Sequence, residues 1–187
     1  MIFIDLWFKE IKWGSISFDF YRPLVLQPLE SRGWTYGINA PRALTSKVSK
    51  QGLESLNDQE RSLLPPQFEM GLDSYKKRFI EVISGGHPLP ERQIERYFTA
   101  QSIWDDTMAW QTHEILSQER DQIFVIIVGD FHNAYQDGLV ARLRARGEHR
   151  VLSISQVDVE GMTNEEAIAE IAPDPEWGVR ADFVWSN

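Results

Sequence analysis

A long segment without glycine or proline, from about Glu91 to Gln118, is the feature that most restricts how this chain can fold. Its apolar residues recur at spacings of three and four, which predicts one continuous amphipathic helix. The apolar segment 123–128 (IFVIIV) follows closely, and its composition predicts a buried strand. This strand runs directly into the sequence GDFH, so a histidine is expected at the point where an apolar strand stops.

Helices and strands are expected to alternate along the rest of the chain. Capping signals mark the start of three helices: Asn39 for the helix over 40–52, and capping boxes beginning at Asn57 and at Thr163. This alternation predicts an α/β fold with a mostly parallel sheet and flanking helices, in which residues 53–118 form a helical subdomain. Further helices are predicted over 3–12, 20–33, 56–66, 71–83, 135–147 and 163–172, and further strands over 34–39, 149–159 and 181–187.

The composition narrows the class of protein. A chain of 187 residues, 42% of them hydrophobic, can bury one substantial core, which predicts a single domain over residues 1–187. A net charge of −9 argues against a nucleic-acid-binding protein. The absence of cysteine excludes disulfides, thiolate nucleophiles, zinc–thiolate sites and iron–sulfur clusters. No apolar run approaches the roughly 20 residues of a membrane-spanning helix. No signal peptide is expected, and the compartment is not predicted.

His132 is the central candidate for a ligand site. In open parallel sheets, ligands bind beyond the carboxyl ends of the strands, where this histidine is expected to stand. Gly129 would allow a sharp turn or a close approach of the backbone to a ligand. Asp130 could orient His132, accept a hydrogen bond or cap the next helix. Alternatively, His132 is a structural residue at the edge of the core.

The other three histidines are interpreted as structural or exposed. These are His87, His113 and His149, and none has a second histidine or a carboxylate at the sequence spacing of a metal site.

Gln101 and Asp105 interrupt the apolar face of the long predicted helix. Buried polar groups need partners. They could fasten the helix to the turn INAPR through an Asp105–Arg42 pair, which is the favoured interpretation, or they could line a pocket. The candidate haem or ligand site therefore comprises His132, Gly129, Asp130, Asn39, Arg42, Gln101 and Asp105, with His132 as the candidate metal ligand.

Several segments together resemble one bacterial family, the ChaN-like haem-binding proteins. The segments are YRP, INAPR with KVSKQGLESL, AQSIWDDTMA, VIIVGDFHNAYQDGLVARL and ADFVW, in the family's order from about residue 18 onward. This family is grouped with Tiki proteases and erythromycin esterases in one superfamily. The resemblance implies an α/β domain with a helical subdomain, and a role in binding haem or handling iron at the bacterial envelope.

The resemblance also shows departures from the family pattern. Gly129 to His132 matches the second Gly-x-x-His motif, but the first histidine motif and its N-terminal strand have no counterpart, so the chain resembles an N-terminally truncated member. Asp130 adds negative charge, which would repel haem propionates unless arginines stand close. The resemblance implies a tyrosine haem ligand, which matches none of Tyr36, Tyr75, Tyr97 and Tyr135 by sequence.

Three functions remain open from the sequence. The first is a protein that binds haem or handles iron, with the macrocycle between aromatic side chains and a Tyr or His on the metal. The second is a hydrolase in which His132 and carboxylates hold a divalent metal ion, which needs about three protein ligands. The third is a non-catalytic remnant that forms a homodimer through an unpaired strand edge.

Overall fold

The structure, a computed structural model, describes residues 17–118 and 122–186. The helix predicted over 3–12 lies outside these residues. The chain divides into two compact units, 1–37 and 38–187.

The described part of the first unit contains a 3-10 turn, η1 (Phe18–Phe20), and the helix α2 (Arg22–Glu30). The predicted helix over 20–33 is therefore confirmed, with proline in its first turn as expected. The Thr35 hydroxyl donates a hydrogen bond to the carbonyl of Val25 and folds the following segment back onto the helix. The strand predicted over 34–39 is wrong, because these residues join no ladder.

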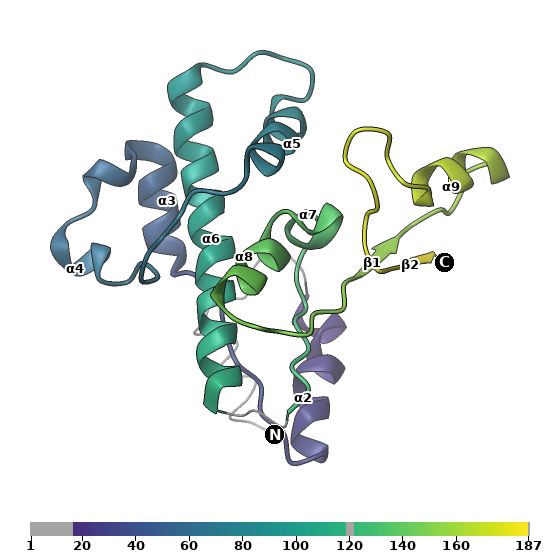
Figure 1. The fold of residues 1–187 in the computed structure, drawn as a ribbon, viewed down its shortest axis with the longest axis horizontal. Helices are drawn as coiled ribbons and strands as arrows, with labels where there is room; N and C mark the ends of the chain where they lie inside the picture. Colours follow the sequence, from purple (N-terminus) through teal and green to yellow (C-terminus); the bar gives the residue numbers. More distant parts are fainter. Residues whose placement is uncertain (1–16, 119–121, 187) are drawn as a thin grey trace. The chain divides into compact units, whose positions relative to one another are not determined.

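The second unit is mainly helical (Figure 1). Its α-helices are α3 (Arg42–Gln51), α4 (Asp58–Arg61), α5 (Asp73–Ser84), α6 (Glu91–Gln118), α7 (Asp130–Asn133), α8 (Leu139–Arg146) and α9 (Asn164–Ile171), and its 3-10 turns are η2 (Leu53–Ser55) and η3 (Ala134–Gln136). The long helix starts at its predicted residue, Glu91, and continues to Gln118, the last described residue before a gap. The capping boxes at Asn57 and Thr163 are both formed. None of the described helices is long and apolar enough to span a bilayer.

The helix α3 begins later than predicted. Its N-cap is Pro41, whereas Asn39 accepts a hydrogen bond from the amide of Ala40. A proline disfavours helical dihedrals at the residue before it, so Ala40 cannot readily continue a helix started at Asn39.

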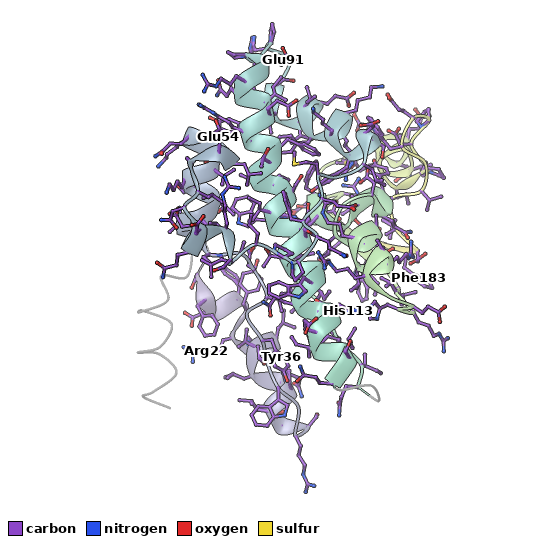
Figure 2. All side chains as sticks on the ribbon, turned by 60° about the vertical axis from the view of Figure 1, so that its left-hand side comes forward. Arg22, Tyr36, Glu54, Glu91, His113 and Phe183 are labelled. Atoms are coloured by element: carbon purple, nitrogen blue, oxygen red, sulfur yellow. The ribbon has the colours of Figure 1, made fainter. Side chains whose placement is uncertain are left out.

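The core of the second unit is built around α6, with α3 and α8 packed on different faces of it (Figures 1 and 2). Ile103 of α6 meets Leu44 and Val48 of α3 in one apolar cluster. Ala109 and Leu143 belong to a second cluster, between α6 and α8. The burial of these side chains is the main favourable contribution to holding the three helices together. A third cluster consists of Tyr75, Phe79 and Phe98, with Phe131 against it.

Two strands form a parallel pair: β1 (Ile154–Val157) and β2 (Phe183–Ser186), with Ile154 opposite Phe183. The connection between them contains α9, as a parallel crossover requires. The α/β class is confirmed, but in the described residues the mostly parallel sheet is reduced to this pair.

The segment 122–128 does not form the predicted strand, although its side chains alternate like those of one. Ile126 and Val128 pack against the cluster between α6 and α8. The alternate residues Ile123, Val125 and Ile127 are 93%, 76% and 55% exposed. A strand forms only when a neighbour supplies hydrogen bonds, and no described segment pairs with this one.

Candidate functional site

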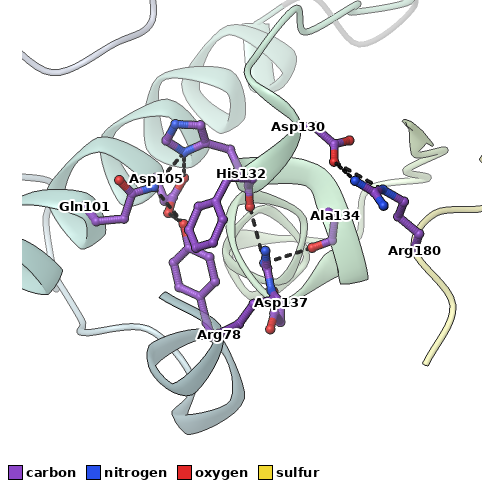
Figure 3. A network of polar contacts seen from close by, with 10 residues as sticks. Arg78, Gln101, Asp105, Asp130, His132, Ala134, Asp137 and Arg180 are labelled. Carbon is purple, nitrogen blue, oxygen red and sulfur yellow. Dashed lines mark hydrogen bonds and ion pairs between the residues drawn. The ribbon is translucent and has the colours of Figure 1, made fainter. Parts of the chain in front are cut away.

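Three of the predicted site residues converge on one buried polar cluster (Figure 3). His132 of α7 places its Nδ1 2.5 Å from Oδ1 of Asp105 and 3.1 Å from Nε2 of Gln101. The phenol of Tyr75 donates a hydrogen bond to the other oxygen of Asp105 and accepts one from Gln101 at 2.9 Å. Asp105 is fully buried, so hydrogen bonds from Tyr75 and His132 replace those to water that its carboxylate has lost.

The Asp105 contact determines which nitrogen of a neutral His132 ring carries the proton. An ionised carboxylate only accepts hydrogen bonds, so the proton is on Nδ1, and the Gln101 amide nitrogen 3.1 Å from this atom then makes a contact and not a hydrogen bond. The lone pair is then on Nε2. A histidine oriented by a carboxylate in this way is the usual arrangement of a metal-ligating histidine. Burial and the Asp105 carboxylate raise the pKa of Tyr75 above its ordinary value, so this phenol stays neutral and keeps donating.

The segment that carries His132 is anchored by a buried arginine, Arg78 of α5. Its guanidinium donates to Oδ1 of Asp137 at 2.5 Å and to the carbonyls of Phe131 and Ala134 at 3.2 and 3.0 Å. It also lies 4.3 Å from the centre of the Phe131 ring. Arg78 therefore contacts the backbone on both sides of His132 and holds this segment against α5.

Of the roles open to Asp130, the structure gives it that of a hydrogen-bond acceptor and not that of orienting His132, and Gly129 is not required by the turn. Asp130 forms an ion pair with Arg180 at 2.9 Å and accepts a hydrogen bond from Ser155, so it is Asp105 that orients the histidine. The arginine does offset the negative charge of Asp130, which the sequence had left without a partner. Gly129 has a φ of −61°, which any residue can adopt, so the turn itself does not require glycine.

A pocket of about 320 Å³ lies beside this cluster, between α3 and α6. Residues spaced three and four apart line it from each helix, because such residues share a helix face. From α3 these are Arg42, Thr45, Ser46 and Ser49, and from α6 they are Tyr97, Ala100, Gln101 and Trp104, with Phe79 of α5 completing the wall. Gln101 belongs to both the pocket and the His132 cluster, and it joins them.

The favoured Asp105–Arg42 pair is wrong. Asp105 is bonded to Tyr75 and His132, whereas Arg42 lies in the wall of the pocket. The Asp105 side chain faces α5 and α7, and sequence spacing along one helix could not indicate which neighbour it meets.

A second pocket, of about 370 Å³, lies on the other side of the anchored turn. Arg78, Asp130, Tyr135, Trp177 and Arg180 contribute to its wall. Both of its arginines are already paired, Arg78 with Asp137 and Arg180 with Asp130. The carboxylates of Glu81 and Asp174 also line it.

Sequence reasoning did not assign Tyr75, Arg78 or Tyr97 to the site. Tyr75 and Arg78 lie three residues apart on the buried face of α5, and an arginine on an apolar helix face could have drawn attention to both. Tyr97 shares its helix face with Gln101, four residues further on.

Comparison with known proteins gives one family. The family model described as haem-binding uptake, Tiki superfamily, ChaN matches residues 6–143. The chain belongs to this ChaN family. The matched range contains the α3–α6 pocket and the His132 cluster, while Arg180, the partner of Asp130, lies beyond it. No curated protein and no solved structure matches the chain.

The described residues offer few metal ligands at any one place. Within 17–118 and 122–186, no three His, Asp or Glu side chains are grouped closely enough to hold a metal ion together.

Proposed function

We propose that this ChaN-family chain binds haem in the pocket between α3 and α6. The observation that carries the proposal is the convergence of aromatic walls, a phenol and an arginine in one pocket. Its volume of about 320 Å³ falls within the range of small-molecule sites, about 300–1,000 Å³. The family description, haem-binding uptake, supports the same ligand.

Tyr97 is the proposed ligand to the haem iron. Its side chain lines the pocket and is 38% exposed, so the phenol oxygen is accessible. Gln93, one turn earlier in α6, donates a hydrogen bond to this oxygen at 3.0 Å. This hydrogen bond orients the phenol oxygen, and tyrosine is one of the side chains that hold haem iron in proteins.

The rest of the pocket fits the other parts of haem. Trp104 and Phe79 offer apolar surface to the macrocycle. Arg42, exposed at the start of α3, supplies positive charge for a propionate, which this acidic chain must provide locally. These residue types therefore fit the group that the family description names.

His132 is the alternative iron ligand, through Nε2. It is not among the residues that line the pocket, and it is linked to the pocket by Gln101. Substituting Tyr97 and His132 one at a time therefore shows which of the two binds the iron.

The test is a titration of the full chain with hemin, followed by the shift of its main absorption band. The wild type should bind one equivalent saturably, and Tyr97→Phe should weaken binding about tenfold or more and change the band position. Arg42→Gln should weaken binding with the band position unchanged, because it removes only a charge partner.

Tyr36→Phe is the matched control, since this exposed tyrosine lies in the other compact unit. Its titration should equal that of the wild type. If Tyr97→Phe also titrates like the wild type while His132→Ala loses the band shift, the iron ligand is His132. Absence of saturable binding by the wild type would end the haem proposal.

A further inference from the structure

His113 and His149 come from separate parts of the sequence and meet face to edge. His113 lies toward the C-terminal end of α6 (Figure 2), and His149 follows α8. Nδ1 of His113 is 2.9 Å from Nε2 of His149, and the two rings are inclined at 77°. Two imidazole nitrogens thus lie within hydrogen-bonding distance of each other, at a place that belongs neither to the haem pocket nor to the His132 cluster.

Gly147 packs closely against both rings. A Cβ atom at this residue would lie 3.0 Å from Cε1 of His113, 3.2 Å from its Nδ1 and 3.2 Å from Nε2 of His149. A side chain here would therefore press on both imidazoles. Gly147 has a φ of 174°, which any residue adopts, so the backbone does not require glycine here. The glycine matters because it has no side chain.

The nitrogen separation selects a class of metal ion. Two nitrogens about 2.05 Å from a metal lie about 2.9 Å apart when they bind at 90°, and about 3.3 Å apart at a tetrahedral angle. The observed 2.9 Å matches the right-angled arrangement of square-planar and octahedral sites. We propose that His113 and His149 form a two-imidazole site for a divalent transition-metal ion of the Ni²⁺ or Cu²⁺ type.

The charges around the pair allow a cation to bind. Arg146, three residues before His149, is neutralised by Asp106 at 2.6 Å. Glu114 directly follows His113, and Glu148 and Arg150 flank His149 in the sequence. All three side chains are exposed.

The site is open. In the described part of the chain no third histidine or carboxylate joins the pair, so water completes the coordination of the ion. A site of this kind binds and releases metal, whereas closed four-ligand sites serve structure. It does not depend on the haem proposal, since the two sites share no residue.

The experiment is a calorimetric titration of the full chain, prepared without a histidine tag, with NiCl₂ at pH 7.5. One equivalent should bind, and His113→Ala and His149→Ala should each weaken binding about tenfold or more. Gly147→Ala keeps both imidazoles but presses a methyl group against them, and it should weaken binding to a similar extent. MgCl₂ should not bind, because Mg²⁺ prefers oxygen ligands.

A second readout identifies the ligands directly. With one equivalent of CuCl₂, electron paramagnetic resonance should show splitting from two imidazole nitrogens, and the splitting from both should be lost in the double alanine variant. His87→Ala removes an exposed histidine elsewhere and His132→Ala removes the histidine of the other cluster, so both should bind Ni²⁺ like the wild type.

Circular dichroism should confirm that every variant is folded before titration. The proposal is overturned if the wild type binds no Ni²⁺, or if the His113→Ala/His149→Ala double variant binds it as the wild type does. In either case the histidines only share a hydrogen bond. Loss of binding in His87→Ala or His132→Ala would equally overturn it, by moving the ion to another site.

Discussion

The surroundings of α6 and the segment 122–128 differ in which side chains they bury. Around α6, even a carboxylate is fully buried, because Tyr75 and His132 satisfy it. In 122–128, apolar side chains such as Ile123 remain in solvent. A helix completes its backbone hydrogen bonds internally and needs partners only for its side chains. A strand needs a neighbour for its backbone first, so its apolar residues are buried only after pairing.

The largest expected effect comes from removing the buried carboxylate. Asp105→Ala leaves the Tyr75 hydroxyl and the Nδ1–H of His132 buried without an acceptor, and it should lower the free energy of unfolding by about 3–5 kcal/mol. Urea denaturation measures this loss. Glu69→Ala, at an exposed position, is the control and should stay within about 0.5 kcal/mol of the wild type. Equal losses in both variants would contradict the importance of the cluster.

A pair of identical substitutions compares the two regions directly. Ile103→Ala, in the cluster between α3 and α6, should cost about 2–5 kcal/mol, because it removes buried methyl groups and leaves a cavity. Ile123→Ala, at a position 93% exposed, should change the free energy of unfolding by no more than about 0.5 kcal/mol. Urea denaturation of both variants measures the two changes in the free energy of unfolding. A cost for Ile123→Ala close to that for Ile103→Ala would show that segment 122–128 is buried in solution.

Acid should loosen the parallel strand pair through one carboxylate. The amide and hydroxyl of Ser153 donate to Asp182 at 2.7 and 2.9 Å and lower its pKa below 3.8. Because the folded pKa is below the unfolded one, the stabilisation is complete well above pH 3.8 and is lost as the pH falls through the folded pKa. The effect should be under about 1 kcal/mol, since Asp182 is exposed.

Urea denaturation at a series of acidic pH values measures this contribution. Asp182→Asn removes the titrating group and should flatten the pH dependence over the same interval. An unchanged slope in that variant would assign the dependence to another carboxylate.

The smallest effect on stability is expected where the exposed apolar face becomes charged. Val125→Lys with Ile127→Lys should alter the free energy of unfolding by no more than about 0.5 kcal/mol. The same change should reduce self-association, because exposed apolar side chains favour association between copies and lysine opposes it. Light scattering at rising concentration compares the variant with Leu63→Lys, at another exposed apolar position. A wild type that stays monomeric throughout would remove the reason to expect a homodimer.

The local features of the fold could be predicted from the sequence. The helix α6 begins directly after Pro90, and the absence of glycine and proline lets it continue through Gln118. The helices α4 and α9 begin at capping boxes that are complete within four residues. These signals depend on atoms close together in the chain, so they hold whatever the rest of the molecule does.

The long-range features could not be predicted. Strand propensity at 34–39 and 122–128 was recognised, but no neighbour pairs with either segment in the described residues. In the candidate site, Gln101, Asp105 and His132 do converge, whereas Asp130 faces Arg180 and Asn39 bonds to the next amide. Each of these outcomes depends on contacts between distant parts of the chain, which side-chain periodicity does not specify.

The order of synthesis has a consequence for the pair β1 and β2. Ile154 pairs with Phe183, which the ribosome adds about 30 residues later, or about 1.5–6 s at ordinary elongation rates of about 5–20 residues per second. During that interval β1 has no strand partner. The Asn133 side chain, already synthesised, donates a hydrogen bond to the carbonyl of Ile154 at 3.0 Å. This contact gives the nascent β1 an early attachment to α7 before its partner strand emerges.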